Sequence, residues 1–179
     1  MEFLTENVTN ASVIAAVISL IGLAFAWQQR KWVLAQDPGS EAMQKISSAV
    51  QDGAKAFMTR EYRAIVIFVI VVAIILYGLS FIEDSGMSPW TTVAFLSGAI
   101  ASGLSGWGGM YIAVRANSRT TQAASDSLNK GLRVAFSSGM VMGTMVVSLV
   151  VFGVSILFAL FAAQLDDPKV AVEALAGFG

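Results

Sequence analysis

The sequence predicts an all-α, polytopic membrane protein with four transmembrane helices in this chain. Of its 179 residues 56% are apolar and only 13% are charged, with a mean hydropathy of +0.71. A soluble domain carries about 25% charged residues. Each of its uncharged runs approaches or exceeds the ~20 residues that a helix needs to cross a bilayer core, where a charge would be costly. These runs cover residues 7–29, 64–82, 85–114 and 134–165.

The distribution of basic residues predicts the orientation. Ten of the eleven Lys and Arg residues lie in 30–63 and 115–133, and Lys169 is the exception. Cytoplasmic loops carry an excess of Lys and Arg, so we expect both segments in the cytoplasm and both termini outside. The first apolar run is followed, not preceded, by its positive residues, the reverse of a signal peptide. We therefore expect a retained, multi-pass protein of the cell membrane (a prokaryotic inner membrane) with its N-terminus outside.

The first half of the chain is expected to hold one span, one break and one long helix. Span one covers about 11–27, and Pro38-Gly39 then interrupts the chain. Ser40 is a suitable N-cap for an amphipathic cytoplasmic helix of about 40–63. No proline separates this helix from the second span, about 64–82, so the two should form one helix. The apolar residues of the cytoplasmic helix recur at three- and four-residue steps: Met43, Ile46, Val50, Ala54 and Phe57.

Small residues mark the third span, about 90–114, and the fourth, about 134–162. A short acidic link, 83–89, precedes span three and predicts a helical hairpin. Small side chains at four-residue steps let helices approach closely in lipid. We interpret the glycines of span three in this way, and not as a phosphate cradle, because they lie inside an uncharged span. The predicted helix-packing residues are Gly98, Ser102, Gly106, Gly109, Gly139 and Gly143.

The tail predicts a turn and the start of another helix. Asp166-Asp167-Pro168 reads as a solvated helix cap and not as a metal site, and 170–175 restarts an apolar helix. A natural C-terminus is usually polar and frayed. We therefore expect residues 1–179 to be a single transmembrane segment of a larger, truncated domain.

Composition excludes several chemistries. The chain has no cysteine and no histidine, which excludes thiol chemistry, Cys/His zinc sites and imidazole catalysis. Arg115 and Arg119 could bind an anionic substrate or orient span three at the interface. The same two interpretations, anion binding or orientation at the interface, apply to Lys55, Arg60 and Arg63, for which lipid headgroups are plausible partners.

From the residues alone, we predict no catalytic, cofactor-binding or metal-binding residue in this chain and no nucleic-acid partner. No ionisable residue other than tyrosine lies in the middle of a span, so the chain holds no obvious ion relay. Two functions stay open. One is the leading part of a larger transporter or membrane enzyme. The other is a small four-span structural or anchor subunit of a membrane complex.

Three stretches resemble the membrane-integral, ion-translocating inorganic pyrophosphatases. Ile46–Tyr62 is similar to the family pattern Gly-Ala-x-Ala-Phe-Leu followed by Glu-Tyr, with Met58 in place of leucine. Gly106–Ala124 is similar to Gly-Met-x-x-Ala-x-x-Ala-Asn-x-Arg-Thr, and Leu132–Gly143 to Ala-Phe-x-x-Gly-x-Val-Met-Gly. The family-motif residues are Gly53, Ala54, Phe57, Glu61, Tyr62, Met110, Asn117, Arg119 and Thr120.

The resemblance implies the N-terminal fragment of a larger membrane-bound inorganic diphosphatase. It implies a homodimer whose subunits have about sixteen membrane helices. It further implies Mg²⁺-dependent hydrolysis of pyrophosphate coupled to transport of H⁺ or Na⁺, with a possible requirement for K⁺ or Na⁺. The choice between these ions stays open.

The resemblance also implies roles within this segment. The family's acidic Mg²⁺- and pyrophosphate-binding motif should follow the position of Gly179. We therefore expect Mg²⁺ to bind outside this segment and the fragment alone to be inactive. Gly53 is expected to be a packing contact, and Asn117 and Arg119 to anchor the cytoplasmic end of span three.

Overall fold

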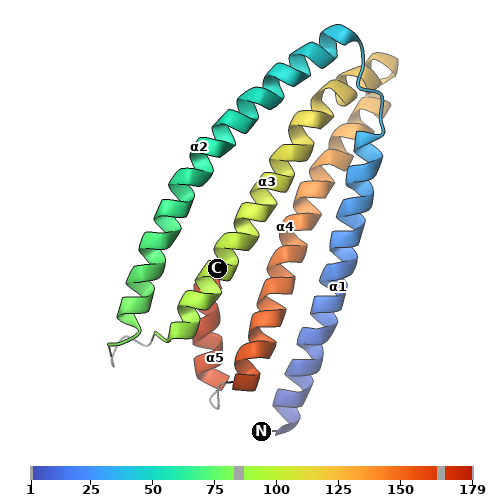
Figure 1. Cartoon of the computed structure of the whole chain (residues 1–179). Helices are drawn as coiled ribbons and strands as arrows, with labels where there is room; N and C mark the ends of the chain where they lie inside the picture. The colour runs from blue at the N-terminus through green and yellow to red at the C-terminus, as the bar shows by residue number, and fades with distance from the viewer. Residues whose placement is uncertain (1, 83–86, 165–167, 179) are drawn as a thin grey trace. The chain divides into compact units, whose positions relative to one another are not determined.

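The computed structural model describes residues 2–82, 87–164 and 168–178, with the side chains of residues 2–9, 163, 168 and 169 left aside. These residues form five α-helices and a 3₁₀ turn, without a strand (Figure 1). The expected turn at Asp166-Asp167 and most of the acidic link lie outside the described residues. The elements are α1 (Glu2–Leu34), α2 (Glu41–Leu79), α3 (Pro89–Asp126), α4 (Leu128–Gln164), α5 (Pro168–Leu175) and η1 (Ala176–Phe178).

Three stretches of the described helices are long and apolar enough to cross a membrane: Asn10–Leu34, Glu41–Leu79 and Leu128–Ala162. The protein is thus a multi-pass membrane protein. At 38 residues, α3 is comparable in length to α1, α2 and α4, but it is not among the three. Glycine, serine and threonine are interspersed with its apolar residues and lower its hydropathy.

The break between α1 and α2 forms where local chemistry predicts it. Gly39 adopts a positive φ of 84°, which glycine tolerates without steric cost. Its amide donates a hydrogen bond to Asp37 Oδ1 at 2.9 Å. Ser40 Oγ accepts a hydrogen bond from the amide of Met43 at 3.4 Å, as an N-cap does. α2 then continues for 39 residues, which confirms that the amphipathic segment and the second apolar run form one helix.

The chain divides into two compact units, each made of parts of several helices. Unit 1 comprises Met1–Ile21, Ala64–Gly103 and Val147–Gly179. In it, α5 folds back against α3 and α4, and the rings of Trp90 and Phe161 lie 5.4 Å apart. The core of unit 1 consists of Ala94, Leu157, Phe161, Ala171 and Ala174.

Unit 2 comprises Gly22–Arg63 and Leu104–Val146 and holds ten of the eleven basic residues. Its core joins α1, α3 and α4 through Val33, Ile112, Ala116, Val134 and Val141. The first part of α2 runs antiparallel to α3. Gly39 approaches Gln122, and further along α2 the Tyr62 hydroxyl lies 3.2 Å from where a Cβ on Gly106 would be.

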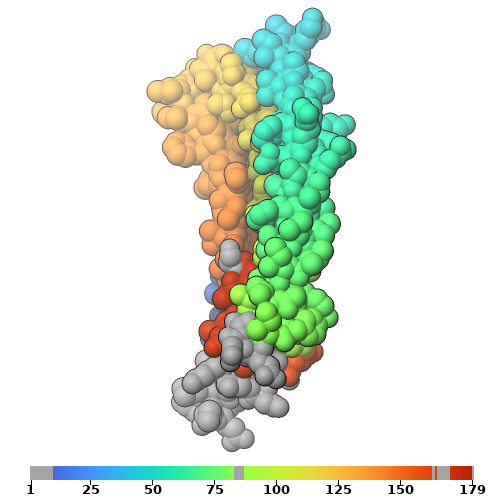
Figure 2. Space-filling view, turned by 90° about the vertical axis from the view of Figure 1, so that its left-hand side faces the viewer, coloured from blue at the N-terminus to red at the C-terminus, as the bar shows by residue number. Residues whose placement is uncertain are grey.

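Three residues of the apolar stripe predicted on the first part of α2 do not pack closely against the rest of the described chain. Ile46, Val50 and Phe57 are 67%, 42% and 57% exposed. Ser47 is the buried residue of α2 instead. α2 lies at the surface in the space-filling view (Figure 2), and none of its most apolar window is buried.

Candidate functional site

Cations and aromatic rings gather where α1 and α3 meet in unit 2. The Arg30 guanidinium lies 4.7 Å from the Trp27 ring centroid and 5.1 Å from that of Tyr111. The Arg115 guanidinium lies only 3.7 Å from the Tyr111 centroid. Such contacts are each worth about 0.5–2 kcal/mol. They hold two positive charges around one tyrosine, and neither arginine forms an ion pair with a carboxylate among the described residues.

Arg119 connects α3 to the end of α1. Its Nε donates a hydrogen bond to the carbonyl oxygen of Leu34 at 3.3 Å, and its Nη1 donates to the carbonyl of Arg115 at 2.7 Å. Leu34 is the last residue of α1, where the final carbonyls lack partners within the helix. Arg119 therefore caps α1 and is committed to backbone contacts.

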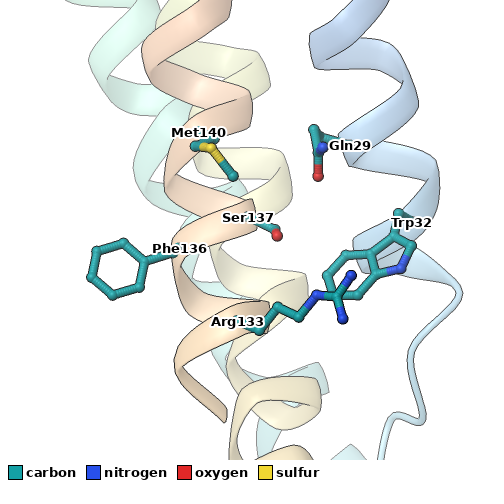
Figure 3. Close-up of a pocket in the computed structure, with 6 residues that line it drawn as sticks. All are labelled: Gln29, Trp32, Arg133, Phe136, Ser137 and Met140. Atoms are coloured by element: carbon teal, nitrogen blue, oxygen red, sulfur yellow. The ribbon is translucent and has the colours of Figure 1, made fainter. Parts of the chain in front are cut away.

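A pocket of about 310 Å³ lies between α1 and α4 (Figure 3). The Arg133 guanidinium lies over the Trp32 ring, 5.2 Å from its centroid. Gln29 and Ser137 face the same space, and Phe136 and Met140 complete the lining. A neighbouring pocket of equal volume reaches Arg119 and the exposed Asp126–Lys130 ion pair, whose atoms are 3.0 Å apart.

A third pocket in unit 2, of about 650 Å³, lies between α2 and α3. We call it the α2–α3 pocket. Lys55, Thr59 and Tyr62 line it from α2. Trp107 and Arg115 line it from α3. It combines two cations with aromatic and apolar walls.

The family-motif residues do not converge on one site. Ala54, Tyr62 and Met110 line the α2–α3 pocket, and Thr120 is half-buried. Other members of the same motifs are exposed and do not line this pocket. These exposed members are Gly53, Phe57, Glu61 and Asn117.

The six predicted packing residues fall into two groups. A Cβ on Gly98 would collide with the Phe178 backbone, one on Gly106 would meet Tyr62, and one on Gly109 would meet Met142. A Cβ on Gly139 or Gly143 would meet nothing within 4 Å among the described residues. Ser102 is exposed. The packing role of all six stays a prediction.

Other glycines, which the sequence analysis does not name individually, also make close approaches. A Cβ on Gly108 would collide with Met145, and one on Gly153 with the Phe178 ring. Gly108 stands beside Gly109 in the glycine-rich stretch, so extending that pattern would have found it. Gly153 has no small partner four residues away, so no spacing signal points to it.

The described residues contain no group of three or more His, Cys, Asp or Glu side chains that could hold a metal ion. No hydrolytic step is derived from these residues. What unit 2 offers chemically is positive charge beside aromatic rings.

The chain matches the family model described as inorganic H⁺ pyrophosphatase over residues 20–179. It is 39% identical over 160 residues to the "K(+)-insensitive pyrophosphate-energized proton pump 2" of Moorella thermoacetica, covering 89% of this chain and 22% of that protein. It is 36% identical to the "K(+)-insensitive pyrophosphate-energized proton pump" of Caldanaerobacter subterraneus, covering 93% of this chain and 24% of that protein.

A sodium pump is among the relatives. The chain is 39% identical over 147 residues to the "Putative K(+)-stimulated pyrophosphate-energized sodium pump" of Bacteroides thetaiotaomicron, covering 82% of this chain and 20% of that protein. The chain thus spans between a fifth and a quarter of the length of these three relatives.

Proposed function

The chain belongs to the inorganic H⁺ pyrophosphatase family, and we propose that the complete protein couples pyrophosphate hydrolysis to transport of H⁺ or Na⁺ across a cell membrane. The single observation that carries this proposal is the family match over residues 20–179. The relatives bear the names of proton and sodium pumps, so both ions remain candidates. A homodimer and a Mg²⁺ requirement, with possible K⁺ dependence, are part of the same proposal.

The segment's role in that protein is to build and orient membrane helices. We propose four spans, adding α3 to the three apolar stretches above. The support is its 38-residue length and the absence of charged residues within it before Arg115. The basic residues of unit 2 support a cytoplasmic location for 30–63 and 115–133, with the N-terminus outside. We expect the exposed apolar part of α2 to contact lipid.

The proposal assigns hydrolysis to residues outside this segment. The support is that the described residues contain no metal-binding group. The 179-residue chain, purified in detergent and supplied with Mg²⁺ and pyrophosphate, should release no phosphate above background. Release well above background would place the active site within this segment and contradict the proposal.

Transport is tested with the protein expressed from its complete gene. Inverted membrane vesicles should acidify when pyrophosphate is added if the ion is H⁺, as reported by a pH-sensitive dye. If the ion is Na⁺, they should take up ²²Na⁺ instead, and uptake should survive a protonophore. Hydrolysis without either movement would contradict a pump, and a reading frame that stops after Gly179 would favour the anchor subunit.

A further inference from the structure

The α2–α3 pocket has a polar end and an apolar end. α2 and α3 are antiparallel here, so Lys55 and Arg115 lie toward one end and Tyr62 and Trp107 toward the other. Trp107 and Arg115 are eight residues apart, about 12 Å along a helix. Since 64–82 and 90–114 are the proposed spans, the aromatic end faces the membrane and the cationic end the cytoplasm.

The charges at the polar end favour an anion. Lys55 and Arg115 line the pocket, and Arg30 adds a third cation beside Tyr111. No ion pair joins any of these three to an acid among the described residues. Asp52 also lines the pocket. It lies three residues, about 4.5 Å, farther toward the cytoplasmic end than Lys55. Farther into the pocket, the charged lining residues are therefore the cations Lys55 and Arg115.

The other walls suit hydrocarbon. Met58, Met110 and Trp107 line the pocket, and Trp107 is 55% exposed. Tryptophan and tyrosine prefer the depth of lipid headgroups. The volume of about 650 Å³ falls within the range of about 300–1,000 Å³ usual for ligand sites.

We propose that the α2–α3 pocket binds an anionic phospholipid. Lys55 and Arg115 contact the phosphate, and Met58, Trp107 and Met110 contact the first carbons of the acyl chains. Basic pockets between membrane helices on the cytoplasmic side bind such headgroups. A soluble phosphate would satisfy the cations but leave the apolar wall uncovered. The inference rests on the proposed membrane placement and not on pumping, so either can fail without the other.

The test is native mass spectrometry of the complete protein released from nanodiscs that contain equal amounts of phosphatidylglycerol and phosphatidylcholine. Wild type should retain phosphatidylglycerol preferentially. The double variant Lys55→Gln/Arg115→Gln should lose about thirtyfold in affinity, because each cation near a membrane surface strengthens anionic-lipid binding several-fold. The matched control Lys45→Gln/Arg63→Gln removes the same charge from exposed sites of α2 outside the pocket and should keep wild-type retention.

Several results would overturn the proposal. Equal loss in both double variants would indicate diffuse surface attraction. Equal retention of the two lipids by wild type would show no headgroup selection. Displacement of the lipid by millimolar inorganic phosphate would identify a soluble anion as the ligand.

A second measurement does not depend on whether the double variant folds. Brominated phosphatidylglycerol should quench the fluorescence of Trp107, obtained by subtracting the signal of Trp107→Phe, more strongly than brominated phosphatidylcholine. Equal quenching by the two lipids would overturn the proposal as well.

Discussion

At the scale of single residues, Arg119 makes a side-chain hydrogen bond to a residue 85 positions away in the sequence. It joins the last carbonyl of α1, at Leu34, to the carbonyl of Arg115 in α3. A planar guanidinium serves two carbonyls at once, and its charge suits the negative end of the α1 dipole. Arg119→Ala should therefore destabilise the protein by about 1–3 kcal/mol. Hydrogen bonds from a charged donor are stronger than neutral ones, and the substitution leaves two carbonyl oxygens without this donor. Thermal unfolding in detergent would measure the loss.

The control for this prediction is a cation of the same unit that has only an exposed partner. Lys130 pairs with Asp126 at 3.0 Å, with their side chains 65% and 56% exposed. An exposed ion pair contributes about 0–1 kcal/mol, so Lys130→Ala should hardly change the unfolding temperature. If it lowered that temperature as much as Arg119→Ala, the capping argument would be wrong.

At the scale of helices, the glycines differ in the space that is available for an added Cβ atom. A Cβ on Gly98 would collide with the Phe178 backbone carbonyl, which no side-chain rotation can move. Gly98→Ala should cost about 1–3 kcal/mol through overpacking. Gly139 meets nothing within 4 Å, so Gly139→Ala should stabilise the isolated chain by about 0.5–1 kcal/mol through helix propensity. Urea or heat unfolding of the two variants gives the comparison.

The Gly139→Ala variant also tests the proposed packing role of the Gly139-xxx-Gly143 step. If a helix outside the described residues uses that step, Gly139→Ala should destabilise the complete protein even though it stabilises the isolated chain. Stabilisation in both would leave the glycines without a packing role.

Local chemistry predicted the break between α1 and α2, whereas long-range contacts were harder to predict. The Pro38-Gly39 break and the Ser40 cap depend on neighbouring residues, so their geometry could be anticipated. The contact of Gly153 with Phe178 depends on α5 folding back onto α4, which no spacing reveals. Periodicity likewise identified an apolar face on α2 but not its partner, and Ser47 is the residue that is buried.

For the candidate site, too, the sequence predicted the local composition but not the contacts between distant residues. Clustering of basic residues in two segments predicted a positively charged region, because charge can be counted from the sequence. It could not predict that Arg119 would be committed to Leu34 while Arg115 lines a pocket, because residues 34 and 119 meet only in the folded chain.

At the scale of the whole molecule, the orientation in the membrane is the property that the charge pattern predicts and that labelling can test. The chain has no cysteine, so each introduced cysteine is a single reporter. Ser48→Cys and Ser125→Cys lie at exposed positions in the two basic segments and should resist a membrane-impermeant maleimide in intact cells. Asn10→Cys, exposed near the N-terminus, should react.

Exposure decides which positions are informative, because a buried cysteine resists labelling on either side of the membrane. Ser47 is only 7% exposed, and protection there would say nothing about topology. Permeabilised cells supply the control, since Ser48→Cys and Ser125→Cys must then react. Labelling of both in intact cells, with Asn10→Cys protected, would invert the topology and place the cations of the α2–α3 pocket on the outer face. The anionic-lipid site would then have to draw on the outer leaflet.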